Sequence, residues 1–209
     1  TNALLPDLEQ KLETNGFKLL HLGELGWAYW FSSKPLRTPN DLKKMKIFTW
    51  AGDFKWERLW EKAGYNPVPL ASVDILSGLQ TGLINTYSTI PLYALSQQSF
   101  GIANHMLDLK WGVLMAGIVI DLRTWQRIPK KYHEELISIT KNIQNKQKEL
   151  NVNAEKQSID AMKQYGLKVQ SIKSDEVSLW KKEVERMSPN IRGKVIPEEV
   201  FDMVRKLTQ

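Results

Sequence analysis

The 209-residue chain contains no cysteine, which excludes disulfide bonds and zinc–thiolate sites. The absence of thiols is in keeping with an oxidising compartment. The chain also has no apolar run as long as a membrane span; its longest, VLMAGIVI over residues 113–120, is ended by Asp121. This short bounded run predicts a strand buried on both of its faces.

Histidine is scarce, and none of His21, His105 and His133 stands at metal-ligand spacing to another ligating residue. A P-loop, a G-x-G-x-x-G fingerprint and a G-x-S-x-G motif are also absent. We therefore expect no metal, no cofactor and no catalytic constellation. Asp53 is the one acid directly after a predicted strand, where α/β proteins place their chemistry. Its simpler role is to cap the helix that begins at Phe54.

The formal net charge is +6, and the densest basic segments, 141–148 and 181–182, lie in helical patterns with Glu and Asn. Such patterns are typical of solvated helix faces, so we expect no nucleic-acid partner. With 42% hydrophobic and 25% charged residues, the composition is that of a globular protein. Neither an initiator Met nor a signal peptide is present, which indicates a processed or truncated product.

Strand and helix patterns alternate along the chain, and this order predicts an α/β fold. Helices are expected over residues 4–15, 41–44, 54–63, 72–82, 91–100, 132–165, 175–187 and 197–207. Strands are expected over residues 17–22, 45–49, 66–70, 83–86, 113–120 and 167–172.

Aromatic residues are abundant, with eight Trp among 209 residues. Several fall at predicted strand ends or in the adjoining loops, namely Trp27, Tyr29, Trp30, Phe48, Trp50, Tyr87 and Trp111. Aromatic side chains at such positions give a small-molecule cleft flat apolar walls with a polar edge. The alternative is that several belong to the core. Trp56 and Trp60, four residues apart on one helix, are predicted to be core residues.

An ordered set of segments, KPLRTPNDLKKMKI, GYNPVPL, ASVDILSGLQTGLIN, FGIANHMLDL, GVLMAGIVIDLRTW and IPKKYHEELISITK, resembles the solute receptors of tripartite ATP-independent periplasmic (TRAP) transporters. The run LSGLQTGLIN is the most specific of them. The resemblance implies an α/β, periplasmic-binding-protein-like fold with mixed sheets, two lobes, hinge strands and a long lobe-spanning helix. It assigns residues 1–26 and 113–149 to a remnant of lobe I, and residues 27–112 and 150–209 to lobe II.

The resemblance also implies export to the periplasm and two partners, a small-molecule ligand and the membrane subunits of a TRAP transporter. Receptors of this family carry an arginine where this chain has Phe48, a second near Ala28, and an asparagine near Thr89. Their replacement leads to the hypothesis of a neutral or largely apolar organic ligand in an aromatic cleft. The expected ligand-binding residues are Trp27, Tyr29, Phe48, Trp50, Asp53, Tyr87, Thr89 and Trp111.

Three alternatives remain open at this stage. One is a receptor for organic acids that uses a different cationic clamp. Another is an enzyme with Asp53 as general base, which needs a titratable partner such as His105. The third is a protein-interaction module that binds no small molecule.

Overall fold

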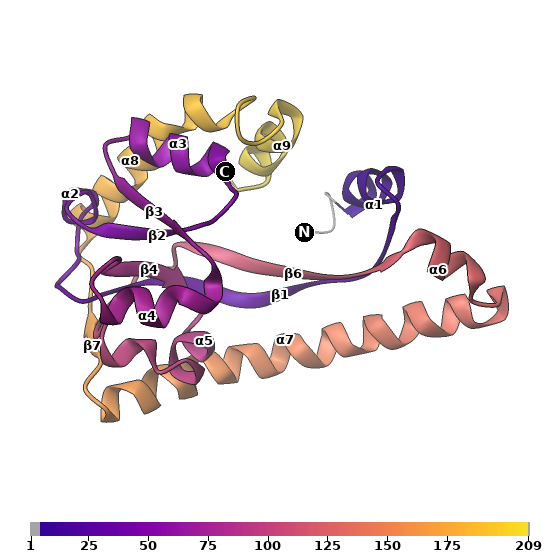
Figure 1. Cartoon of the computed structure of the whole chain (residues 1–209), viewed down its shortest axis with the longest axis horizontal. Helices are drawn as coiled ribbons and strands as arrows, with labels where there is room; N and C mark the ends of the chain where they lie inside the picture. The colour runs from indigo at the N-terminus through magenta and orange to yellow at the C-terminus, as the bar shows by residue number, and fades with distance from the viewer. Residues whose placement is uncertain (1–4, 209) are drawn as a thin grey trace. The chain divides into compact units, whose positions relative to one another are not determined.

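The structure is a computed structural model that describes residues 5–208, except for the side chains of residues 144, 145, 147–149 and 208 (Figure 1). The helices are α1 (Leu5–Thr14), α2 (Pro39–Leu42), α3 (Phe54–Lys62), α4 (Ile75–Gln80), α5 (Pro91–Ser96), α6 (Leu122–Arg127), α7 (His133–Gln164), α8 (Ser174–Ile191) and α9 (Glu198–Thr208). The strands are β1 (Phe17–Ser32), β2 (Lys46–Trp50), β3 (Asn66–Leu70), β4 (Thr86–Thr89), β5 (His105–Leu107), β6 (Gly112–Asp121) and β7 (Lys168–Gln170). Short 3-10 turns cover Ser72–Asp74, Ser99–Gly101 and Lys130–Tyr132.

The predicted α/β class and the long helix α7 are confirmed. Strand β1 differs from the expectation, because it runs from Phe17 through the aromatic segment to Ser32. Trp27 and Tyr29 therefore lie inside a strand and not in a loop beside one. Alternation of side chains along this strand sends neighbouring aromatic residues to opposite faces of the sheet.

The chain divides into two compact units. The first comprises residues 1–27 and 113–156, and the second comprises residues 28–112 and 157–209. β1, β6 and α7 each contribute residues to both units.

The second unit contains a mixed sheet with the strand order β3-β2-β4-β1-β5-β7. β2 is parallel to β3 and to β4, and β5 is parallel to β7, whereas β1 runs antiparallel to both β4 and β5. Helices α4 and α5 cover one face of this sheet, and α3 and α8 cover the other (Figure 1). This three-layer arrangement explains why side chains on both faces of β2 and β4 are buried, the two threonines of β4 included.

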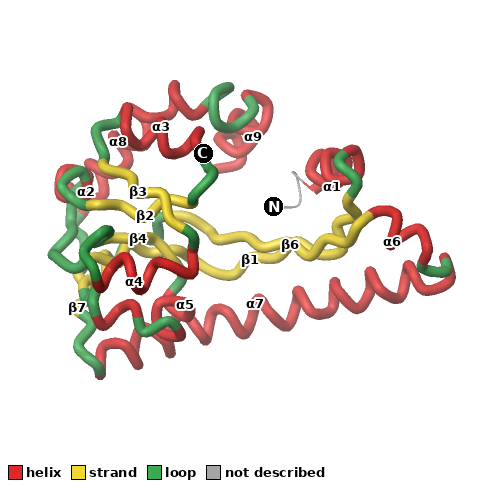
Figure 2. The backbone as a smooth tube through the Cα atoms, in the orientation of Figure 1, coloured by secondary structure: helices red, strands yellow, loops and turns green. Residues whose placement is uncertain are grey.

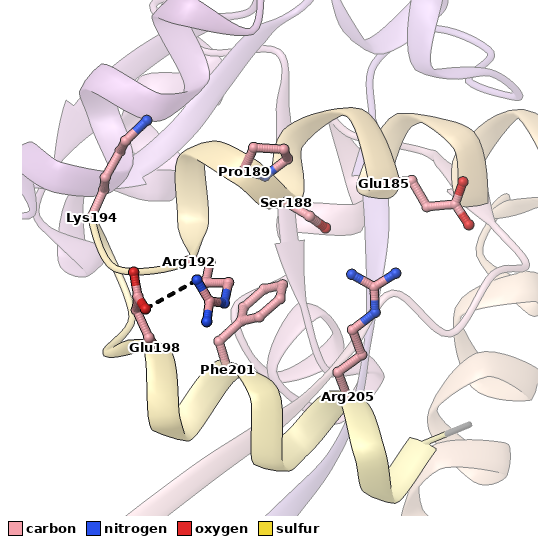
Figure 3. Close-up of a pocket in the computed structure, with 8 residues that line it drawn as sticks. All are labelled: Glu185, Ser188, Pro189, Arg192, Lys194, Glu198, Phe201 and Arg205. Carbon is pink, nitrogen blue, oxygen red and sulfur yellow. Dashed lines mark ion pairs between the residues drawn. The ribbon is translucent and has the colours of Figure 1, made fainter.

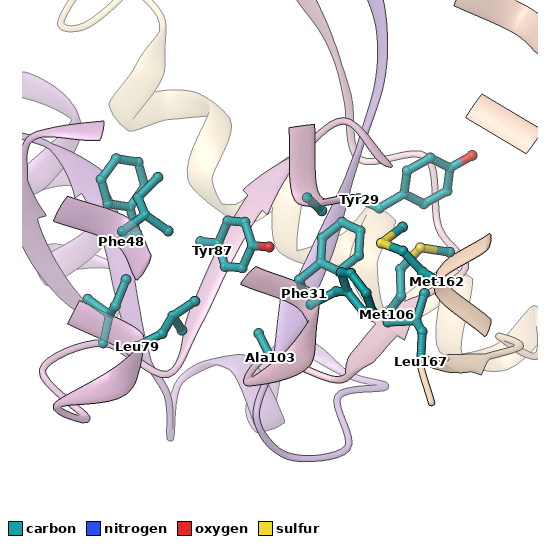
Figure 4. Packing of buried hydrophobic residues seen from close by; sticks show 13 residues of the cluster. Tyr29, Phe31, Phe48, Leu79, Tyr87, Ala103, Met106, Met162 and Leu167 are labelled. Atoms are coloured by element: carbon teal, nitrogen blue, oxygen red, sulfur yellow. The ribbon is translucent and has the colours of Figure 1, made fainter. Parts of the chain in front are cut away.

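Alternate residues of the strands supply two separate cores. Tyr29 and Phe31 of β1 and Phe48 of β2 belong to the core under α4 and α5, which Figure 4 shows from close by. Trp30 and Ile47, their direct neighbours in sequence, belong to the core under α3 and α8. The period-2 pattern of a strand buried on both faces therefore places each aromatic residue.

Tryptophan rings dominate the core under α3 and α8. Trp30 lies 6.2 Å from Trp60 and 5.4 Å from Trp111 between ring centroids, and Trp111 lies 5.4 Å from Trp180. The prediction that Trp60 is a core residue is confirmed, since only 9% of it is exposed. Inclined aromatic pairs at these separations add to the stabilisation from buried area.

The first unit contains a ribbon of β1 and β6 (Figure 2). From α7, the Thr140 hydroxyl donates to the Leu20 carbonyl (2.8 Å) and the Asn151 amide donates to the Glu24 carbonyl (2.7 Å). These two donors stand eleven residues apart, three turns of helix, so they project from one face of α7. Both hydrogen bonds tie α7 to the backbone of β1.

The prediction that residues 113–120 form a strand is confirmed, but the prediction that this strand is fully buried is wrong. Val113, Leu114, Ile118 and Val119 are each 36–50% exposed. β6 pairs with β1 in the described part of the chain, and its side chains lack the double cover that the second unit's strands receive. An apolar run alone does not report which layers surround it.

A buried carboxylate links α8 to the segment around α2 and α3. Glu183 accepts hydrogen bonds from Tyr65 (2.8 Å) and Arg186 (2.7 Å), and Lys43 lies 3.1 Å from the same oxygen. The hydrogen bond from Arg186, followed by those from Tyr65 and Lys43, lowers the pKa of Glu183 to about 2 against the cost of burial. The folded state therefore favours the ionised form of this group.

We predict that Glu183→Gln destabilises the protein by about 2 kcal/mol at neutral pH, because two cationic partners lose their anion. The stabilisation from ionised Glu183 is complete above its ordinary pKa of 4.5 and is lost as pH falls toward 2. Urea unfolding of parent and variant at neutral pH and in acid checks this, with exposed Glu185→Gln as control. A gap in unfolding free energy that stays constant in acid would contradict it.

Candidate functional site

The carboxyl ends of β2 and β4 meet at one edge of the second unit's sheet, because these strands are parallel. Trp50 is the last residue of β2, and Thr89 is the last residue of β4. Antiparallel β1 pairs Tyr29 with Thr89 and so brings Tyr29 to the same edge. Ligands of open α/β sheets bind outside this edge.

Trp50 offers an exposed aromatic surface at the edge. Its side chain is 57% exposed, and its ring meets Phe48 edge-on, with 5.4 Å between centroids and an interplanar angle of 70°. Phe48 is only 7% exposed and is part of the core under α4 and α5. Phe48 therefore supports the Trp50 ring from beneath, and Trp50 has free surface for a solute.

Three further predicted residues are packed below this surface. Tyr29 is 3% exposed, Tyr87 is 0% exposed and Thr89 is 8% exposed. The Tyr87 hydroxyl lies 2.6 Å from the Ser99 hydroxyl, and burial raises the pKa of Tyr87. Tyr87 lies on β4, the strand next to Phe48, and Tyr29 lies one strand further along on β1. Contact of these residues with a solute stays a prediction.

Trp27 and Trp111 are not members of the core that holds Phe48, Tyr29 and Tyr87. Trp27 is 39% exposed and belongs to the first unit. Trp111 packs beside Trp30 against the core under α3 and α8, on the face of the sheet opposite to Phe48. Five of the eight predicted ligand-binding residues therefore lie at or beside the carboxyl edge of the sheet, namely Tyr29, Phe48, Trp50, Tyr87 and Thr89. Asp53 follows Trp50 by three residues, and Trp111 lies on the other face of the sheet.

Asp53 ends the tight turn that follows β2. Its backbone N–H donates to the Trp50 carbonyl (3.1 Å), and Gly52 takes a φ of +93°, which a turn of this kind requires at its third position. The Asp53 carboxylate then accepts a hydrogen bond from the backbone N–H of Trp56 (3.3 Å) as the N-cap of α3. The same turn therefore fixes the backbone of Trp50 and starts the helix.

His105 does not reach Asp53. It is the first residue of β5, at the amino end of the strands, where its Nδ1 lies 3.1 Å from the Gln170 amide nitrogen. Burial, together with the charge of Lys168, lowers the pKa of His105. The pair of titratable groups that an enzyme with Asp53 as base would need is therefore at opposite edges of the sheet.

Sequence reasoning missed two buried polar atoms near the edge. Among the described residues, Trp30 Nε1 and Thr49 Oγ1 are buried without a hydrogen-bond partner, as is His21 Nε2 in the first unit. The register between the strands decides which of these atoms lie on the same face of the sheet. Local sequence does not specify this register.

A hollow lies between α8 and α9 (Figure 3). Its lining includes Arg192, Glu198, Phe201 and Arg205. Arg192 is held by Glu198 (3.0 Å) and by Asp202 (2.7 Å), so its charge is already matched within the chain. The ion pairs fix α9 against the end of α8.

Among the side chains that the structure describes, no cluster of His, Asp and Glu has the arrangement of a metal site. No described helix is both long enough and apolar enough to cross a membrane.

The family model of the bacterial extracellular solute-binding proteins, family 7, matches residues 2–192. A similar protein is the 2,3-diketo-L-gulonate-binding periplasmic protein YiaO of Escherichia coli (strain K12). The two are 28% identical over 167 residues, which is 78% of this chain and 50% of that protein. The chain thus spans about half the length of this relative.

Solved structures of TRAP periplasmic solute-binding proteins share the fold. One from Shewanella oneidensis with bound succinate has a TM-score of 0.85 at 17% identity, covering 94% of this chain and 64% of that one. One from Xanthobacter autotrophicus Py2 with bound β-D-galacturonate has a TM-score of 0.84 at 18% identity, covering 98% and 68%. The ectoine-binding protein of Halomonas elongata has a TM-score of 0.81 at 15% identity, covering 88% and 61%.

We predict that Asp53→Ala lowers the stability of the protein by about 1 kcal/mol and that Asp53→Asn leaves it nearly unchanged, since Asn caps a helix as well as Asp does. Thermal unfolding of the two variants beside the parent measures this. Equal losses in both variants would show that the negative charge matters more than the cap.

Proposed function

Because the chain belongs to family 7 of the bacterial extracellular solute-binding proteins, we propose that it is part of a periplasmic receptor for a TRAP transporter. The receptor binds a neutral or largely apolar organic solute at the carboxyl edge of the second unit's sheet. The family consists of solute-binding proteins and not of enzymes. The exposed indole of Trp50 above buried Phe48 is the observation that carries the proposal.

The chemistry of this edge favours a solute without negative charge. The residues that end β2 and β4 and the N-cap of α3 carry aromatic, hydroxyl or acidic groups, namely Trp50, Thr89 and Asp53. A carboxylate placed against Phe48 without a cation would lose several kcal/mol of hydration free energy. Neutral hydroxyl and carbonyl groups cost far less to transfer. A solute hydroxyl can donate to the Asp53 carboxylate, and a hydroxyl or a carbonyl can accept from the Thr89 hydroxyl.

The relatives support a second candidate, a receptor for an organic acid. The Escherichia coli relative binds 2,3-diketo-L-gulonate by its name, and two of the similar structures hold succinate and β-D-galacturonate. In such a receptor a cationic side chain elsewhere in the protein would bind the carboxylate, because position 48 is Phe. A titration that compares an organic acid with its neutral lactone separates the two candidates.

Capture by closure is the proposed mechanism. In this view the first and second units belong to lobes I and II, and β1, β6 and α7 connect them. A solute that binds the closed form more tightly than the open form shifts the population toward closure. The membrane subunits then recognise the closed receptor and use an ion gradient.

The charge of the solute is tested with a matched pair, L-gulonate and its neutral L-gulonolactone, by calorimetric titration of the full-length receptor. We expect the lactone to bind at least about tenfold more tightly, because the gulonate carboxylate loses hydration on binding and the lactone has no charge to desolvate. A tenfold difference in affinity corresponds to about 1.4 kcal/mol of binding free energy. Tighter binding of gulonate would favour the organic-acid candidate.

We predict that Trp50→Ala weakens binding of L-gulonolactone at least about tenfold, because loss of a stacked indole removes a major apolar contact. Leu83→Ala is the matched control. Leu83 is 49% exposed and lies before β4, toward the amino ends of the strands. Equal affinities of the two variants would remove Trp50 from the site.

A further inference from the structure

Three polar side chains form a row across three neighbouring strands, on the sheet face that α3 and α8 cover. Trp30 of β1 pairs with Ser88 of β4. Ile47 of β2 pairs with Thr86 of β4, and two residues further along both strands Thr49 and Ser88 share the face of that pair. The order across the row is therefore Thr49, Ser88 and Trp30.

Two members of this row have unused hydrogen-bonding groups. Thr49 is 6% exposed and Trp30 is 2% exposed, and within the described chain neither Thr49 Oγ1 nor Trp30 Nε1 has a partner. On the opposite face the buried Tyr87 hydroxyl is bonded to Ser99. Buried polar groups in folded proteins are nearly always bonded, so each unpaired group calls for a partner.

The surroundings of the row explain why protein atoms do not fill this need. The Trp30 ring has Trp60 and Trp111 as its aromatic neighbours, at 6.2 Å and 5.4 Å. Their carbon surfaces offer little to an N–H donor, and the indole N–H can only donate. A single oxygen carrying a hydrogen can accept from Trp30 and bond to the hydroxyl of Thr49 or Ser88.

We propose that Thr49, Ser88 and Trp30 form a buried binding site for one hydroxyl oxygen. Thr49 and Ser88 each stand one residue before the carboxyl end of their strand. The oxygen belongs to a hydroxyl group of the solute, and an ordered water is the other source of the same chemistry. The solute source rests on the function proposed above and extends it to a hydroxylated ligand that reaches past the edge of the sheet. The water source is independent of that function.

A high-resolution crystal structure of the full-length receptor, grown with L-gulonolactone, tests the site directly. We expect an oxygen within about 3 Å of both Trp30 Nε1 and Thr49 Oγ1. A lactone oxygen there identifies the solute as the source, and an isolated oxygen identifies water. Electron density without an oxygen, or with both groups bonded to protein atoms, overturns the proposal.

Thr49→Val provides a second test in solution, with Thr86→Val as matched control. Thr86 lies on the same face, is fully buried and donates from Oγ1 to the Phe31 carbonyl (2.8 Å). Thr86→Val should lower the melting temperature and leave lactone affinity unchanged. If the solute supplies the oxygen, Thr49→Val raises the melting temperature without lactone and weakens lactone binding about tenfold, the effect of one lost hydrogen bond.

If water supplies the oxygen, Thr49→Val lowers the melting temperature as Thr86→Val does and leaves lactone affinity unchanged. A higher melting temperature together with unchanged affinity overturns the proposal, because it shows a hydroxyl that binds nothing. Binding of gulonate in preference to the lactone, with an oxygen present at the site, would contradict the neutral solute and leave this site standing.

Discussion

The antiparallel pairing of β1 with β4 is the constraint on which the second unit depends. The register Tyr29 with Thr89 and Trp30 with Ser88 decides which aromatic side chains face α4 and α5 and which face α3 and α8. A slip by one residue would exchange every side chain between the two cores. The same pairing brings Tyr29 to the edge where β2 presents Trp50, so the fold and the candidate site share one determinant.

Local sequence patterns predicted much of this fold and less of the site. Helix α7 and the cap at Asp53 follow from periodicity and from turn chemistry that act over a few residues. The length of β1 and the exposure of Ile118 do not, because they depend on which layers cover a strand. The unpaired groups of Thr49 and Trp30 depend on the register of three strands, which are distant in sequence.

The candidate site divides the aromatic residues by what they can do. Phe48, Tyr29 and Tyr87 are packed in the core that adjoins the edge. Trp50 carries its indole outside that core, with a turn and a helix cap fixing its backbone. A rigid exposed ring over an apolar base binds flat, uncharged surfaces well and offers no compensation for a buried anion. In the function proposed above, the charge of the solute therefore decides whether it binds at this edge.

Mass spectrometry of the full-length receptor as purified, under native and then denaturing conditions, tests this role of charge most directly. A small molecule that stays bound in the native state and separates on denaturation is the solute that the site selects. We predict that this molecule is neutral. An organic acid in its place would contradict the proposed function, because a carboxylate would then have to be bound by a cation away from Phe48.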